Sequence, residues 1–116
     1  MVEAFGESPQ ALRDLSVSLE IVGDLQRVLT RSDEALASYE ESLGIRRSLL
    51  EAFGEAPQAL LDLATVCGSL VELRGAESRG TRDVLAEGTH AIERAIQLYG
   101  KLPKLVEVQE WLKSLA

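Results

Sequence analysis

An internal repeat constrains this chain more than any other feature of its sequence. Residues 3–12 read EAFGESPQAL and residues 51–60 read EAFGEAPQAL, so the two segments differ only at Ser8 and Ala56. The segments start 48 residues apart, and two further residues downstream match at the same offset. A period of this length accommodates a pair of helices, so the repeat predicts a stack of helical hairpins.

Glycine and proline mark helix ends in both copies of the repeat. Gly6 and Gly54 each follow a phenylalanine, where the end of a helix favours a residue that tolerates a positive φ angle. Pro9 and Pro57 stand where the first turn of the next helix tolerates a residue without an N–H group. Ser8 is well suited to cap that helix, whereas the alanine of the second copy is not.

Apolar residues recur with the helical period in five segments of the chain, and we expect these stripes to face the core. The second stripe ends at Phe53 and the fourth at Tyr99. The first stripe consists of Leu12, Leu15, Leu19, Val22 and Leu29. Apolar residues make up 46% of the chain while aromatic residues make up only 4%, so the core must consist mainly of aliphatic side chains. We expect an all-α fold, a right-handed α-solenoid of antiparallel helical hairpins. The expected helices span residues 9–29, 33–53, 57–74, 81–99 and 103–116.

The first four of these helices form two hairpin units, and the fifth closes the stack. The units cover residues 9–54 and 57–99. A solenoid must cover its last apolar face with a helix that is polar outside, and we expect residues 103–116 to be this capping helix. Trp111 is expected to pack within it rather than to anchor a ligand. The inward side chains of the capping helix would be Leu105, Val108, Leu112 and Leu115.

The N-terminal end of the stack is expected to be open. Residues 1–6 copy the last turn of the second helix, so we interpret them as the stub of a preceding helix. The first helix carries a second apolar face, with Val17, Ile21 and Val28, and it lacks the neighbour that the third helix has in the second. Exposed apolar patches mark interaction sites, so this edge would pair with an upstream repeat or with a second copy of the chain.

The first hairpin resembles the tetratricopeptide repeat family, in the long form found in bacterial multi-repeat proteins. The resemblance implies that Gly23 lets the second helix approach the first, while Ala35 and Tyr39 fill the groove between them. It is weaker in the second unit, where Val71 stands in the position of Gly23 and Gly88 falls near the position of Tyr39. There a bulky residue and a small one would have exchanged sides. The matching residues are Val22, Gly23, Ala35, Tyr39, Ser42 and Leu43.

The resemblance also implies a binding face. In tetratricopeptide arrays the first helix of each unit lines a concave face that binds extended peptides or partner helices. The family's carboxylate-binding clamp needs basic and amide residues there, but this sequence offers Glu20, Asp24 and Glu72. Three acids would repel a carboxylate, so a basic or mixed-charge partner fits better, and the alternative is a solvated polar face without a ligand. Mapped position by position, the face holds Arg13, Val17, Glu20, Asp24, Arg27, Thr65, Gly68, Ser69 and Glu72.

Charge and hydropathy exclude several classes of function. The formal net charge of −7 argues against binding to nucleic acid or to an anionic membrane, since both require a basic surface. No apolar stretch approaches the roughly 20 residues that a membrane span needs. The N-terminus lacks the basic and apolar regions of a secretion signal, so we expect a cytoplasmic protein.

The sequence contains no pattern typical of an active site, a metal site or a cofactor site. His90 is the only histidine, and a metal site needs several converging ligands. Cys67 lies on an apolar helix and is expected to be a small core residue. Arg46 and Arg47 follow a pair of glutamates on the second helix, which fits a salt-bridged outer face. We therefore expect no catalytic activity, metal or cofactor.

Two functions remain open at this point. The first is a non-enzymatic protein-interaction scaffold that binds a peptide or a partner helix on the concave face. The alternative is a structural module that self-associates as a homodimer through its open N-terminal edge. Size-exclusion chromatography with light scattering separates the two, because only the second predicts a tight dimer.

Overall fold

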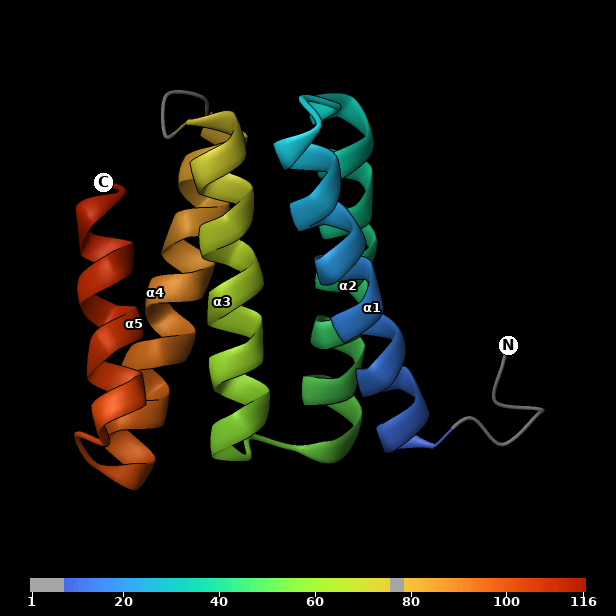
Figure 1. Cartoon of the computed structure of the whole chain (residues 1–116). Helices are drawn as coiled ribbons and strands as arrows, with labels where there is room; N and C mark the ends of the chain where they lie inside the picture. The colour runs from blue at the N-terminus through green and yellow to red at the C-terminus, as the bar shows by residue number, and fades with distance from the viewer. Residues whose placement is uncertain (1–7, 76–78) are drawn as a thin grey trace. The chain divides into compact units, whose positions relative to one another are not determined.

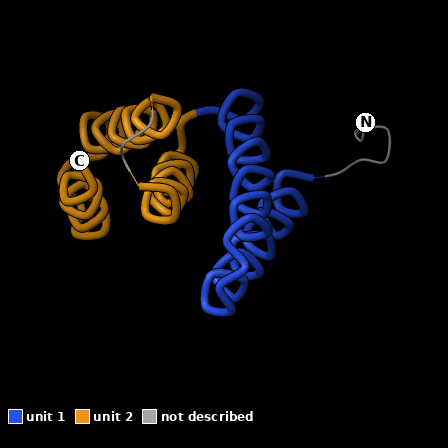
Figure 2. Tube along the Cα trace, turned by 90° about the horizontal axis from the view of Figure 1, so that it is seen from above, with its two compact units in different colours: residues 1–54 blue, residues 55–116 orange. Residues whose placement is uncertain are grey.

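The computed structural model describes residues 8–75 and 79–116, and every regular element within these ranges is an α-helix (Figure 1). The chain divides into two compact units, Met1–Gly54 and Glu55–Ala116 (Figure 2). The predicted all-α class is confirmed, whereas the stacking of hairpins into a solenoid stays a prediction. The expected helical stub at 1–6 lies outside the described residues. The helices are α1 (Pro9–Val28), α2 (Ser32–Phe53), α3 (Pro57–Arg74), α4 (Arg79–Tyr99) and α5 (Pro103–Ser114).

The helix ends lie where the glycine and proline pattern predicts them. Pro9 begins α1, and the Ser8 hydroxyl accepts a hydrogen bond from the backbone N–H of Ala11 at 3.0 Å. The second copy has no such side-chain cap, because Ala56 stands at the same place before α3. Gly54 follows α2 with a φ angle of +95°, a conformation that side chains with a Cβ atom rarely adopt. Local sequence therefore determines these boundaries.

Unit 1 is a hairpin of α1 and α2 held together at a glycine. A Cβ atom on Gly23 would lie 2.8 Å from the Cε1 atom of Tyr39, closer than real Cβ contacts. Ala35 and Tyr39 on α2 are fully buried. The predicted close approach at Gly23, with Ala35 and Tyr39 filling the groove, is confirmed.

Unit 2 packs α3, α4 and α5 around a shared core. α3 buries eight of its 18 residues, and Cys67, which was expected to be a small core residue, is fully buried. The close contact with α4 lies at Gly88, where a Cβ atom would lie 2.8 Å from the Cβ atom of Cys67. The close-approach glycine of this hairpin therefore sits on its second helix and meets Cys67, while the predicted exchange of Val71 and Gly88 stays a prediction. α4 and α5 bury Ala91, Ile92, Ala95, Leu105, Val108 and Leu112.

Several apolar side chains that were expected in the core are exposed. Leu15, Val22 and Leu29 on α1 and Phe53 at the end of α2 all face solvent. α2 packs on the side of α1 that carries Gly23, and one neighbour covers only one arc of a helix. Leu15, Val22 and Leu29 lie outside that arc, so the prediction that they face the core was wrong. Leu12 and Leu19 of the same predicted stripe are half-buried.

The loop that opens unit 2 is held by the end of α4. The guanidinium of Arg94 pairs with the carboxylate of Glu55 at 3.0 Å, and this pairing raises the pKa of Arg94 above its ordinary value. The hydroxyl of Tyr99 donates a hydrogen bond to the backbone carbonyl of Glu55 at 2.6 Å. Tyr99 was expected in the core of the second hairpin, but it is exposed and bonds this loop instead.

Candidate protein-interaction surfaces

The first half of the predicted concave face contains an acid that is bound from α2. The Glu20 Oε2 atom lies 2.8 Å from Nη2 and 2.9 Å from Nε of Arg46, and it accepts a hydrogen bond of 2.5 Å from the Ser42 hydroxyl. Arg46 is only 4% exposed, so its expected place on an outer salt-bridged face was wrong. A guanidinium can be buried here because Glu20 reaches across from α1 and neutralises it.

The second acid of this half is bound in a similar way. The hydroxyl of Tyr39 donates a hydrogen bond to the Oδ1 atom of Asp24. Burial of the ring, and then the hydrogen bond to Asp24, raise the pKa of Tyr39 from 10.0 to about 12, which keeps the phenol protonated as a donor. Arg27 also hydrogen-bonds to the tyrosine side chain, and its charge opposes part of this rise. Arg13 and Val17 complete this half and are half-buried.

The second half of the predicted concave face lies against α5. A Cβ atom on Gly68 would meet the ring of Trp111 at 2.4 Å. The indole N–H of Trp111 donates a hydrogen bond to Oε2 of Glu72 at 2.9 Å. Thr65 bonds the carbonyl of Leu61 within its own helix. Ser69 is half-buried between these positions. α5 therefore contacts the surface that the resemblance assigned to a peptide, and Trp111 packs as predicted, while the role of α5 as a cap stays a prediction.

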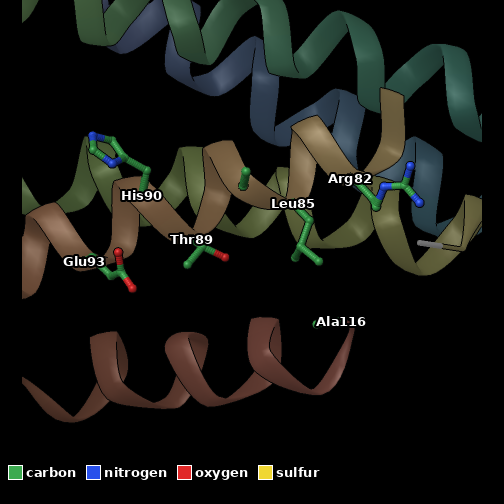
Figure 3. A pocket seen from close by; sticks show the side chains of 7 residues that line it. Arg82, Leu85, Thr89, His90, Glu93 and Ala116 are labelled. Atoms are coloured by element: carbon green, nitrogen blue, oxygen red, sulfur yellow. The ribbon is translucent and has the colours of Figure 1, made fainter. Parts of the chain in front are cut away.

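Unit 2 has shallow grooves among its described residues, and two of them involve α4 or α5. The smaller, of about 300 Å³, lies between α3 and α5 and is lined by Thr65, Val108 and Trp111 together with the ion-paired Lys104 and Glu107. The larger, of about 500 Å³, lies along α4 (Figure 3). In Figure 3 Thr89 and Glu93 point toward α5, whereas His90 points away from it.

Neither groove contains a set of metal-binding side chains. Within residues 8–75 and 79–116, no cluster of three or more His, Cys, Asp or Glu side chains could hold a metal ion. The helices that the structure describes also include none with the length and hydropathy of a membrane span. The larger groove is lined by both apolar and polar side chains. They are Arg82, Leu85, Ala86, Thr89, His90, Glu93 and Ala116.

An exposed apolar stripe runs along α1 on the side turned away from Gly23. We call it the α1 apolar face and define it by six residues whose side chains are between 45% and 77% exposed. The prediction that Ile21 and Val28 are partly bare is confirmed, while Val17 is half-buried. Leu25 was not predicted to be part of this face. Its spacing of four residues from Ile21 and three from Val28 places it on the same side of the helix and could have identified it. The face consists of Leu15, Ile21, Val22, Leu25, Val28 and Leu29.

Comparison with known proteins adds no relative to this description. No family model matches the chain, and no match was found among curated proteins or among solved structures. The resemblance to tetratricopeptide repeats therefore rests on the residues of the first hairpin, and the function is inferred from the surfaces of the chain.

Proposed function

We propose that this chain is a non-enzymatic protein-interaction module, and that it binds the apolar side of a partner helix along the α1 apolar face. The observation that supports this proposal is the exposure of six large apolar side chains on a single helix. Fully burying one such side chain contributes about 1.5–3 kcal/mol, so covering the face provides a substantial driving force for association. Contiguous exposed apolar surface of this kind is typical of interaction sites.

The spacing of the face favours a helix as the partner. Leu15, Val22 and Leu29 are seven residues apart, and Ile21 and Val28 repeat that interval beside them. Apolar residues that recur with this period form the seam along which two helices pack side chain into side chain. A peptide that binds by strand addition would instead need free backbone hydrogen-bonding groups, and those of α1 are used within the helix.

The proposal moves the binding surface away from the concave face suggested by the family resemblance. Glu20, Asp24 and Glu72, the acids expected to attract a basic partner, already accept hydrogen bonds from Arg46, Tyr39 and Trp111. A ligand there would have to replace these contacts, whereas the α1 apolar face presents side chains whose burial requires no broken bond. The resemblance itself remains part of the proposal, supported by the contact of Gly23 with Tyr39.

The proposal is tested by capture of partners from an extract of the source cells, with quantitative mass spectrometry. The immobilised chain is compared with an Ile21→Lys, Leu25→Glu variant, which places two charges in the α1 apolar face. An Ala37→Lys, Ser48→Glu variant adds the same charges at exposed positions of α2 and serves as the matched control.

We expect the native chain and the control to retain proteins that the α1 variant does not retain. These proteins can be foreign or copies of this chain. Equal recovery by all three forms would contradict the proposal. Circular dichroism of the three forms verifies that each remains helical.

A further inference from the structure

We infer that the partner of the α1 apolar face is a second copy of this chain, with the two α1 helices packed antiparallel about a twofold axis between Ile21 and Val22. The inference rests on the proposed function, because it names a partner for the same face. A twofold contact uses one surface twice, so that surface must be complementary to itself. The shape and the charge of the α1 apolar face both meet this condition.

The length of the face determines where the axis lies. The face begins at Leu15 and ends at Leu29, and α1 itself ends at Val28. An axis near its midpoint lets each half of one face cover the opposite half of the other. An axis near Leu25 would place the partner of Leu15 beyond the end of the helix. An axis close to Ile21 and Val22 covers the stripe from Leu15 to Val28 and leaves Leu29 at its end, opposite Asp14 of the second copy.

Side-chain sizes fit this register. The smallest residue within the stripe is Ser18, one turn before Val22, and the antiparallel arrangement places it opposite Leu25 of the second copy. Leu15 then faces Val28, and Ile21 faces Val22 across the axis. Large residues that meet small ones fill an interface without voids or overlap. In a parallel pair, each Leu25 would instead meet the other Leu25 and each Ser18 would face Ser18.

Charges at the two ends of the face favour the same arrangement. Asp14 is exposed beside its N-terminal end, and Arg31 is exposed at the turn that follows its C-terminal end. Antiparallel packing brings Asp14 of each copy near Arg31 of the other, whereas parallel packing brings like charges together. Within one chain, Asp14 accepts a hydrogen bond of 2.8 Å from Gln10, and Arg31 lies 3.7 Å from Glu34. Both partners are exposed residues close by in the sequence. Such exposed pairs are weak and can be exchanged.

The expected dimer is a weak one. α1 has 20 residues, and a helix of that length extends about 30 Å. One pair of helices of this length buries less than the roughly 800 Å² per partner of a standard interface. We therefore expect monomer and dimer to interconvert over the micromolar concentration range rather than to form a permanent complex.

Sedimentation equilibrium of the full chain over a wide concentration range tests the inference. The native mass should rise from the monomer value of 12.6 kDa toward twice that value with increasing concentration. Leu25→Glu should shift the dissociation constant upward by at least tenfold. Asp14→Arg alone and Arg31→Asp alone should each weaken association by several fold, while the double exchange Asp14→Arg, Arg31→Asp should restore it.

Restoration by the double exchange separates this arrangement from a dimer that uses another surface. A native chain that stays monomeric at every concentration overturns the inference, and so does a dimer that none of the variants weakens. The proposed function fails on a different result, namely capture of the same proteins with and without charges in the α1 apolar face. If the chain is monomeric and captures a foreign helix through that face, the inference that the partner is a second copy is wrong. The proposed function is then still supported.

Discussion

Gly23 lies beneath the ring of Tyr39, so that a Cβ atom on the glycine would stand 2.8 Å from the ring carbon Cε1. The ring cannot easily retreat, because it is fully buried and its hydroxyl bonds to Asp24. This contact places Gly23 on the side of α1 that packs against α2, opposite the exposed α1 apolar face.

A larger residue at this position should force the hairpin apart. We expect Gly23→Leu to lower the free energy of unfolding by about 1–3 kcal/mol, the usual effect of an overpacked core. Urea denaturation followed by circular dichroism measures the change. Gly44→Ala is the matched control, because no atom lies within 4 Å of its added Cβ, and alanine there should stabilise α2 slightly. An unchanged denaturation midpoint for Gly23→Leu would contradict the described contact.

The buried phenol of Tyr39 predicts a loss of stability at high pH. Its pKa is raised from 10.0 to about 12 in the folded chain, so folding favours the protonated form. The stabilisation is fully present below pH 10 and is lost as the pH rises from about 10 to about 12. Urea denaturation of the native chain and of Tyr39→Phe at several pH values isolates this effect. The stability of the native chain should fall more steeply than that of the variant, and parallel curves would contradict the assignment.

The Glu20–Arg46 pair should respond unequally to removal of its two members. Arg46 is 4% exposed and Glu20 20% exposed, so loss of the acid leaves the more deeply buried charge without its partner. We expect Glu20→Leu to cost about 3–5 kcal/mol and Arg46→Met to cost less. The double variant should cost less than the sum, because no charge is left buried. Urea denaturation of the native chain, the two single variants and the double variant provides a double-mutant cycle. Strictly additive changes in the free energy of unfolding would show that the pair is not coupled.

Contact between Gly68 and Trp111 can be followed by fluorescence, because Trp111 is the only tryptophan. A Cβ atom on Gly68 would lie 2.4 Å from the ring, so Gly68→Val should displace α5 or turn the indole toward water. We expect the emission maximum to shift to longer wavelength and the free energy of unfolding to fall by about 1–3 kcal/mol. Gly80→Ala, where nothing lies within 4 Å, is the control. An unchanged spectrum of Gly68→Val would contradict the described packing of α5.

Features that depend on neighbouring residues were predictable from the sequence. Ser8 caps α1 because a hydroxyl three residues before Ala11 can reach its N–H, and Gly54 ends α2 because it tolerates a positive φ angle. Gly23 could be assigned to the helix contact because its spacing to Ala35 and Tyr39 resembles a known hairpin.

Features that depend on distant residues were not predictable in the same way. Arg46 resembled a surface residue because its partner, Glu20, lies 26 positions away on the other helix. Trp111 meets Gly68 and Glu72 through the packing of α5, which no local pattern encodes. Leu15 and Leu29 appeared to be core residues because periodicity shows that a stripe is apolar but not which neighbour covers it.

Photo-crosslinking in the source cells tests the central claim, that the α1 apolar face is an interaction surface, most directly. A photoreactive phenylalanine derivative replaces Leu25 in one form of the chain and the exposed Ser48 on α2 in the other. Irradiation should produce a discrete adduct from position 25 and none from position 48, and the mass of the adduct identifies either a second copy or a foreign protein. Absence of an adduct at position 25, or the same adducts from both positions, would contradict the account.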